Sequence, residues 1–302
     1  MNWKQLQLIK DQTIGVLNKH HGLKNGIIKS LMGIGSLTSP LRVYPDFIIA
    51  GVQKAGTTSL YHYLKEHPCI FLPLKQEVHY YDFMYQKGLL YYRSHFPTEF
   101  FKHLILKLRG CFKTGECTPY YFVHPRVPRR IALENPEVKI LVLFRDPIER
   151  TYSHYQHEFQ KKREKLCFKE ALECEEKRLK NEKTKLTNSE NYYSYNHHRY
   201  SYLERSRYAD QVRVWEKYFD RKQFLFISSE KLFSDPQCVM DKCYDFLEVH
   251  RYRLRNPKIY NARQYSPMDE NVKDILIRYF RPLNEKLYEL TGKNYGWEKN
   301  YR

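Results

Sequence analysis

Short apolar runs, each bounded by residues that interrupt strands, predict the framework of the chain. Residues 45–52 (PDFIIAGV), 138–144 (VKILVLF) and 223–228 (QFLFIS) show almost no alternation of polar and apolar positions. Such continuous runs are typical of strands that are buried on both faces of a parallel sheet. We therefore predict one parallel strand in each of these three ranges.

Segments with helical spacing follow or precede these strands. Residues 60–67 place apolar side chains on one helical face, and Pro147 opens a second predicted helix over 148–159 (IERTYSHYQHEF). A third helix is expected around 202–218, before the third strand. Strands that alternate with helices indicate an α/β fold, a single domain with a central parallel sheet flanked by helices.

Three other segments differ in polarity. Residues 272–290 carry an apolar stripe at helical spacing, and Pro282 within it predicts a break. Residues 161–185 mix charges of both signs, which favours a solvated surface helix. Residues 191–208 are crowded with Tyr, His and Arg, so this segment either lines a ligand cleft or packs as an aromatic-rich segment.

The N-terminal residues 1–43 are predicted to form a basic, weakly helical arm, with the domain over 44–302. The arm shows no pattern of a secretory signal and no run of about 20 apolar residues that could act as a membrane anchor. The seven cysteines include no CxxC pair, and their spacing matches neither a disulfide framework nor a zinc site. We therefore expect free thiols in a reducing compartment and a cytoplasmic location.

Charge adds a constraint on the partner. The 302 residues include 52 Lys and Arg against 34 Asp and Glu, a formal net charge of +18. This excess favours a polyanionic partner, such as nucleic acid, anionic lipid, acidic glycan or nucleotide. Nucleic acid is not expected, because the sequence contains no zinc-finger, basic-zipper or RNA-recognition pattern.

The segment GVQKAGTTS (51–59) has the position of a phosphate-binding loop, between a buried strand and a helix. Backbone amides and the positive end of the helix dipole make an anion site there. Gly51 and Gly56 have the separation found in the GxxxxGK[ST] loop of nucleotide triphosphatases, but Thr57 replaces the lysine and the basic residue is Lys54. This difference favours a shorter phosphate arm, bound without a metal, over a triphosphate with Mg²⁺.

A second anion site is predicted at the end of the second strand. Arg145 follows that strand directly, and ligands of open α/β sheets bind outside the carboxyl ends of the strands. Ser153 lies on the helix that follows. The alternative for Arg145 is a purely structural ion pair with Asp146 or Glu149.

Together, GVQKAGTTS and LVLFRDPIERTYSHY (141–155) resemble the phosphosulfate and 3′-phosphate motifs of sulfotransferases that use 3′-phosphoadenosine 5′-phosphosulfate (PAPS). The chain is similar over residues 44–298 to the heparan-sulfate branch and, more closely, to its soluble bacterial relatives. Further matching segments occur in the same order: KQEVHYYD (75–82), KGLLYYRSHFP (87–97), GECTPYYFVHP (115–125), SYLERSRYADQ (201–211) and RPLNEKLYELTGKNYGW (281–297).

The resemblance implies catalytic roles for Glu77, Lys54 and His79, with Asp82 in a supporting position. Glu77 would remove the proton of the acceptor, with His79 and Asp82 in support. Lys54 would contact the sulfuryl group and the bridging oxygen, where negative charge develops as the S–O bond breaks. In the glycosaminoglycan enzymes a lysine stands where this chain has Cys117, so one positive group near the acceptor is missing.

The resemblance also implies the contacts with the donor. By position, the loop around the 5′-phosphate consists of Lys54, Ala55, Gly56, Thr57, Thr58 and Ser59. The 3′-phosphate would contact Arg145 and Ser153, and two further cofactor contacts would be Tyr208 and Arg263. No metal site is expected.

We therefore expect a sulfotransferase that moves a sulfuryl group from PAPS to a hydroxyl or amine of a small molecule or saccharide, leaving 3′,5′-adenosine bisphosphate. One alternative is a P-loop kinase that uses ATP and Mg²⁺, against which Thr57 argues. The other is a non-catalytic protein that binds polyanions, against which Glu77 and Lys54 argue, because binding needs no general base. The sequence indicates neither the acceptor nor the oligomeric state.

Overall fold

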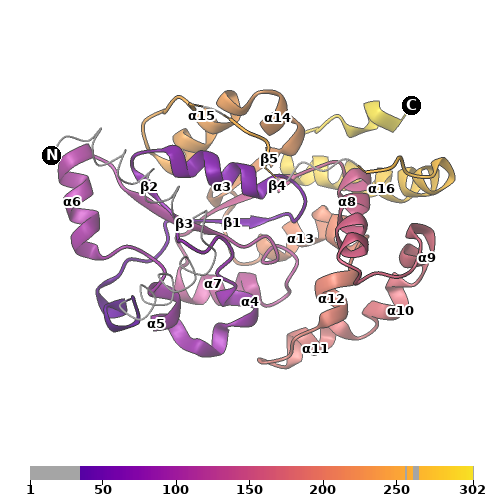
Figure 1. Ribbon diagram of the computed structural model, residues 1–302, viewed down its shortest axis with the longest axis horizontal. Helices are drawn as coiled ribbons and strands as arrows, with labels where there is room; N and C mark the ends of the chain where they lie inside the picture. The colour runs from indigo at the N-terminus through magenta and orange to yellow at the C-terminus, as the bar shows by residue number, and fades with distance from the viewer. Residues whose placement is uncertain (1–34, 256, 261–264, 302) are drawn as a thin grey trace.

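A parallel five-stranded sheet forms the centre of the protein in a computed structural model that describes residues 35–255, 257–260 and 265–301 (Figure 1). The strand order is β2-β3-β1-β4-β5, so the predicted α/β domain with a central parallel sheet is confirmed. The strands are β1 (Phe47–Gly51), β2 (Ile70–Phe71), β3 (Lys113–Cys117), β4 (Lys139–Phe144) and β5 (Phe224–Ser228).

Helices cover both faces of the sheet. In Figure 1, α3 and α15 lie on one side of the strands, and α7 and α13 lie on the other. The α-helices are α3 (Thr57–Glu66), α4 (Tyr80–Phe83), α5 (Gly88–Arg93), α6 (Glu99–Arg109), α7 (Val127–Glu134), α8 (Pro147–Gln160), α9 (Phe168–Glu173), α10 (Glu175–Leu179), α11 (Glu182–Asn188), α12 (Tyr195–Tyr200), α13 (Tyr208–Trp215), α14 (Ser229–Ser234), α15 (Pro236–Leu247) and α16 (Glu270–Thr291). The 3₁₀ turns are η1 (Ser39–Leu41), η2 (Tyr85–Lys87), η3 (Glu204–Ser206), η4 (Arg221–Gln223) and η5 (Trp297–Tyr301).

The three strands predicted from apolar runs are β1, β4 and β5, and they lie side by side at the centre and one edge of the sheet. Every residue of β1 is buried, as is every residue of β4 after Lys139. The sequence did not indicate β2 or β3. Strand β2 has only two residues, and β3 (KTGEC) buries the polar Thr114 and Glu116, so neither produces an apolar run.

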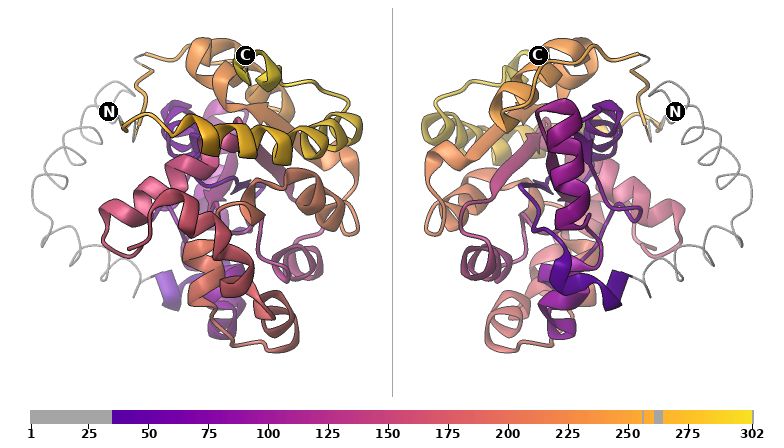
Figure 2. Two further views of the ribbon diagram at one scale, coloured as in Figure 1. Left: turned by 90° about the vertical axis from the view of Figure 1, so that its right-hand side faces the viewer. Right: turned by 90° about the vertical axis from the view of Figure 1, so that its left-hand side faces the viewer.

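The helix α16 corrects one prediction. It runs without a break from Glu270 to Thr291 although Pro282 lies inside it. Figure 2 shows α16 as one long helix, and it packs against α8 and α13. Phe280 and Leu287, on either side of the proline, are both buried. Burial of this apolar stripe therefore outweighs the backbone hydrogen bond that the proline cannot donate.

The charged segment 161–185 is not the single solvated helix that was expected. It contains a turn followed by α9, α10 and α11, and it buries several carboxylates. Glu164 accepts hydrogen bonds from Arg178 and from the Tyr202 hydroxyl (2.9 Å), and Glu175 accepts two backbone amides at residues 203–204. These charges attach the segment to the rest of the domain instead of only facing solvent.

The helix predicted around 202–218 is also shorter than expected. It begins at Tyr208 because residues 201–207 form a turn around the buried guanidinium of Arg205. That group donates to the carbonyl oxygens of His197 (3.1 Å) and His198 (2.7 Å) near the end of α12, so it satisfies acceptors that the helix itself leaves free.

The expectation of seven free thiols is wrong for two of them. Cys69 and Cys111 form a disulfide across 42 residues of sequence. The fold brings the ends of α3 and α6 together before β2 and β3, and sequence spacing alone could not indicate this pairing. The cytoplasmic location rested in part on free thiols, and it stays a prediction.

Most of the N-terminal arm, residues 1–34, lies outside the described residues. Residues 39–43 contact the domain, since Arg93 donates to the carbonyl oxygens of Pro40 (3.0 Å) and Arg42 (2.7 Å). Across the ranges that the structure describes, no helix has the length and apolarity that a bilayer crossing requires.

Candidate active site

A cavity of about 790 Å³ opens at the carboxyl edge of the sheet. Because the strands are parallel, their carboxyl ends meet at one edge, where the segment after each strand contributes to the lining, including Glu77 and His79 after β2. Lys54 follows β1, Pro119 follows β3, Arg145 follows β4 and Ser229 follows β5. The sheet therefore brings together segments that are far apart in the sequence.

The loop between β1 and α3 forms one wall of this cavity. Gly56 caps α3 with a φ of 91°, and a Cβ atom there would lie 2.7 Å from Cζ of Phe233. Glycine at this position therefore allows both the left-handed turn and the close approach of Phe233. Lys54, Thr57 and Thr58 line the cavity, with the first amides of α3 beside them. The arrangement matches an anion site at a helix N-terminus.

Three hydrogen-bonded side chains, Glu77, His79 and Asp82, lie beside this loop. His79 sits between two carboxylates, with Nε2 2.9 Å from Oε2 of Glu77 and Nδ1 2.7 Å from Oδ2 of Asp82. Asp82 is buried, whereas the Glu77 side chain is half exposed and lines the cavity with His79. The chain thus connects a buried carboxylate to one that can contact a ligand.

Electrostatics set the proton on His79. Burial alone would lower its pKa, but hydrogen bonds and charge from Asp82 and Glu77 raise the pKa of His79 to about 9. The imidazole is therefore protonated at neutral pH and donates to both carboxylates. Burial raises the pKa of Asp82, and the His79 hydrogen bond opposes that effect.

Tyr121, after β3, fixes the backbone next to His79. The backbone amides of Tyr80 (2.9 Å) and Tyr81 (3.2 Å) donate to the Tyr121 hydroxyl, which in turn donates to the buried Glu116 at 3.2 Å. Burial raises the pKa of Glu116 to about 7, against the hydrogen bonds that it accepts. Tyrosine hydroxyls thus fix the start of α4, which follows His79 directly.

Arg145 and Ser153 lie on the other side of the loop between β1 and α3, here called the phosphate-type loop. The Arg145 guanidinium donates to the Lys54 carbonyl oxygen at 3.1 Å and pairs with Glu149 at 3.3 Å. The ion pair that we considered as an alternative is therefore present, and Arg145 lines the cavity as well. Ser153, also in the lining, lies 3.4 Å from the Tyr265 hydroxyl.

The structure brings most of the predicted site residues to this one cavity. They are Lys54, Gly56, Thr57, Thr58, Glu77, His79, Arg145 and Ser153. Ala55 and Ser59 are buried behind the loop, and the Ser59 hydroxyl accepts the Tyr260 amide at 3.0 Å. Tyr208 lies behind Arg145, donating its hydroxyl proton to the Arg145 carbonyl oxygen at 2.9 Å without entering the lining. Arg263 lies outside the described residues.

Several lining residues were not singled out from the sequence. His198 and Arg199, on α12, face the same cavity as His79. The crowding of Tyr, His and Arg over 191–208 was the available signal, and the segment does both things that were considered. Its α12 residues line the cavity, while Ser201, Tyr202 and Arg205 are buried.

Cys117, which stands where the glycosaminoglycan enzymes have a lysine, makes no polar contact in the cavity. It is fully buried at the end of β3, and its Sγ lies 3.9 Å from the Thr57 carbonyl oxygen. Burial raises the pKa of this thiol well above its usual value, so the side chain is neutral. Cys117 therefore contributes no positive charge to the site, and it is not among the lining residues of the cavity.

These features define what the site can do. Backbone amides with Lys54 provide one position for an anionic group and Arg145 provides a second, and the Arg145–Lys54 hydrogen bond connects the two. Glu77 provides a carboxylate that can accept a proton next to them. The site therefore combines anion binding with general-base chemistry.

Comparison with known proteins agrees with this geometry. The sulfotransferase domain family matches residues 44–276. Mouse heparan sulfate glucosamine 3-O-sulfotransferase 6 is 28% identical over 286 residues, covering 85% of this chain and 75% of that protein. The membrane-associated sulfotransferase kil1 of Dictyostelium discoideum is 27% identical over 319 residues, covering 84% of this chain and 66% of that protein.

A solved structure extends the comparison. A sulfotransferase from Alicyclobacillus acidocaldarius superimposes with a TM-score of 0.65 at 27% identity, covering 85% of this chain and 99% of that one. Neither the kinase nor the non-catalytic alternative is favoured by these matches. The chain therefore belongs to the sulfotransferase family, and its reaction is sulfuryl transfer.

Proposed function

We propose that the sulfuryl donor is PAPS and that the acceptor is a hydroxyl or amine of a saccharide or small molecule. The observation that carries this proposal is the shared cavity of Lys54, Glu77 and Arg145. It combines two anion positions with one general base and matches the needs of a donor that carries a phosphosulfate and a separate 3′-phosphate.

The donor fits the residues that are present. The amides at the start of α3, with Thr57 and Thr58, support binding of the 5′-phosphosulfate. Arg145 and Ser153 support binding of the 3′-phosphate, because a guanidinium can bind a phosphate through two charge-assisted hydrogen bonds. When bound, PAPS supplies an activated sulfuryl group on a leaving group that is already ionised.

Glu77 is the proposed general base. Its Oε2 accepts a hydrogen bond from His79, which leaves Oε1 to accept the proton of the acceptor. His79, held in turn by Asp82, fixes the direction of the Glu77 carboxylate. As the acceptor oxygen or nitrogen bonds to sulfur, its proton passes to Glu77 and the S–O bond to the 5′-phosphate breaks. Lys54 stabilises the charge that develops on that bridging oxygen.

One positive charge and one neutral imidazole line the acceptor side of the cavity. Arg199 supplies the charge, whereas burial lowers the pKa of His198 far below neutrality, and together they support a polar or anionic acceptor. The relatives named for heparan sulfate act on a saccharide, but Cys117 removes one positive charge from this side. We therefore propose the broader class of hydroxyl- or amine-bearing saccharides and small molecules.

Titration calorimetry of nucleotides tests the donor. Wild-type protein should bind 3′,5′-adenosine bisphosphate more tightly than adenosine 5′-phosphate or ATP with Mg²⁺. Arg145→Ala should weaken the bisphosphate by about ten- to 150-fold, from roughly 1.5–3 kcal/mol for one charge-assisted contact, and should leave adenosine 5′-phosphate nearly unchanged.

The matched control is Lys165→Ala, which removes an exposed positive charge in the turn before α9. It should change neither affinity. Equal losses of both nucleotides in Arg145→Ala would place the 3′-phosphate elsewhere, and tight binding of ATP with Mg²⁺ but not of the bisphosphate would contradict the proposed donor.

A further inference from the structure

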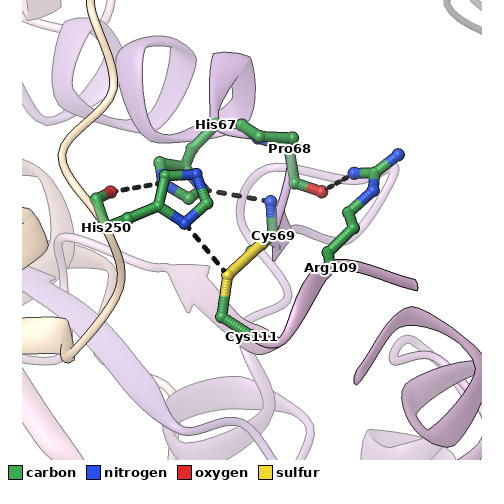
Figure 3. The surroundings of a disulfide bond; sticks show 6 residues. All are labelled: His67, Pro68, Cys69, Arg109, Cys111 and His250. Atoms are coloured by element: carbon green, nitrogen blue, oxygen red, sulfur yellow. Dashed lines mark hydrogen bonds between the residues drawn. A yellow bond between two sulfur atoms is a disulfide. The ribbon is translucent and has the colours of Figure 1, made fainter. Parts of the chain in front are cut away.

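A second cluster of reactive side chains lies at the opposite end of α3 from the phosphate-type loop. It consists of His67, Cys69, Cys111 and His250, and Figure 3 shows these side chains turned toward one another. Cys69 and Cys111 form the disulfide, with their Cα atoms 5.7 Å apart. His250 Nδ1 lies 3.3 Å from Cys111 Sγ. The donor atoms of His67, Cys69 and His250 all lie within 4.8 Å of one another.

The two histidines are placed as ligands would be. His67 is buried directly after the end of α3, with both ring nitrogens facing the cluster. Its Nδ1 accepts the Cys69 amide at 3.0 Å, and its Nε2 donates to the His250 carbonyl oxygen at 2.8 Å. His250 is exposed and brings Nδ1 directly to the sulfur of Cys111.

We propose that the reduced form of this cluster binds one Zn²⁺ ion through Cys69, Cys111, His250 and His67. Two thiolates and two imidazoles are the ligand set of closed, tetrahedral structural zinc sites, and soft sulfur with imidazole nitrogen favours zinc over Mg²⁺ or Ca²⁺. The four residues come from three separate segments, so they approach one another only in the folded chain. The site is independent of the proposed donor and acceptor.

The disulfide and the zinc site are alternative states of the same two sulfur atoms. A dithiol reductant supplies two electrons and two protons, which break the Cys69–Cys111 bond while the reductant becomes a disulfide. Zn²⁺ then replaces the two thiol protons, which pass to solvent. His67 exchanges one of its two present hydrogen bonds for a bond to the metal.

The two states connect different parts of the fold. The disulfide joins only the segments before β2 and β3, whereas zinc would also hold His250, in the segment after α15. That segment continues to residues that contact α3, where the Tyr63 hydroxyl donates to the Lys258 carbonyl oxygen at 2.8 Å. The zinc-bound form therefore attaches this connection to the sheet edge at one more point.

Cobalt titration of the full chain tests the proposal. Protein that has been reduced with a phosphine and freed of metal should bind one equivalent of Co²⁺, with thiolate-to-metal charge-transfer absorption and the strong visible bands of a tetrahedral site. Zn²⁺ should displace the cobalt and raise the melting temperature of the reduced protein. Oxidised protein should show neither spectrum nor shift.

Variants identify the ligands. Cys111→Ser should reduce the charge-transfer band because one of the two thiolates is lost, and His250→Gln should weaken cobalt affinity at least tenfold. Because His250 is exposed, its variant keeps the test valid even if a cysteine variant folds poorly. The control is Cys238→Ser, an exposed free cysteine on α15, which should behave as wild type. Absence of the band in reduced wild type, an unchanged affinity in His250→Gln, or equal binding by oxidised protein would overturn the proposal.

Discussion

His79 connects two carboxylates of different exposure and fixes their orientation. It donates to Glu77 and Asp82 at 2.9 and 2.7 Å, and its backbone has a φ of 57°, which places the ring between them at the start of α4. A histidine that donates to two carboxylates keeps its proton well above its usual range. The orientation of Glu77 therefore depends on the protonation of its neighbour.

This coupling predicts a pH-dependent contribution to stability. The pKa of His79 rises from 6.5 to about 9 on folding, so its stabilisation is fully present below 6.5 and is lost as the pH rises through about 9. Urea unfolding of wild type and His79→Gln should show an advantage of up to about 3 kcal/mol for wild type near neutral pH that shrinks toward alkaline pH.

The control for this measurement is His103→Gln, which changes an exposed histidine on α6. Its stability difference from wild type should stay constant over the same pH interval. A difference between wild type and His79→Gln that grows toward alkaline pH would mean that His79 is not held protonated by the two carboxylates.

Among the elements, α16 shows most directly how packing overrides local preference. Pro282 interrupts the backbone ladder, yet the buried stripe of Leu276, Phe280 and Leu287 continues on both sides of it. Pro282 itself is exposed, so its ring makes no contribution to the core that would compensate for the lost hydrogen bond.

Pro282→Ala should therefore stabilise the protein. Alanine restores an amide donor inside the helix and removes the ring clash, for a gain on the order of 1–3 kcal/mol in the free energy of unfolding. The matched control is the substitution Lys286→Ala, which changes an exposed position one turn later and should have little effect. A loss of stability in Pro282→Ala, measured by denaturant unfolding, would show that the proline has a packing role.

The contrast between local preference and tertiary packing also explains which strands the sequence could predict. Strands β1, β4 and β5 are apolar runs, so local composition predicts them, and residues at their carboxyl ends, such as Lys54 and Arg145, can be placed at one edge by topology alone. Strand β3 contains the polar Glu116, whose burial depends on tyrosines from α5 and the β3–α7 loop. No local pattern indicates that arrangement.

The sequence indicated some residues of the candidate site and not others. Glu77 and His79 lie in a loop with no periodic signal, and only the resemblance to a family indicated them. Arg199 lines the cavity on α12, which contacts α4 through the rings of His198 and Phe83, and the Cys69–Cys111 pairing depends on where α3 and α6 end. Both features depend on tertiary packing, so local sequence patterns could not predict them.

At the scale of the whole molecule, the parallel sheet determines the function. Five parallel strands end at one edge, and the segments that follow them contribute residues to one cavity. The net charge of +18 gives the surroundings a positive field that attracts an anionic donor. In the proposed mechanism, binding and proton removal are carried by different residues on this edge, so single substitutions should separate them.

Transfer of labelled sulfuryl from PAPS by wild type and Glu77→Gln tests the central claim most directly, with the best acceptor from a panel of saccharides and small alcohols and amines. Wild type should transfer the label, and Glu77→Gln should transfer it about 10²–10⁴-fold more slowly because the general base is lost, while its affinity for the bisphosphate stays unchanged. Glu173→Gln, which alters an exposed carboxylate on α9, should match wild type. Activity of Glu77→Gln within about threefold of wild type, well below the 10²-fold minimum for a lost base, would contradict the assignment of this carboxylate as the base.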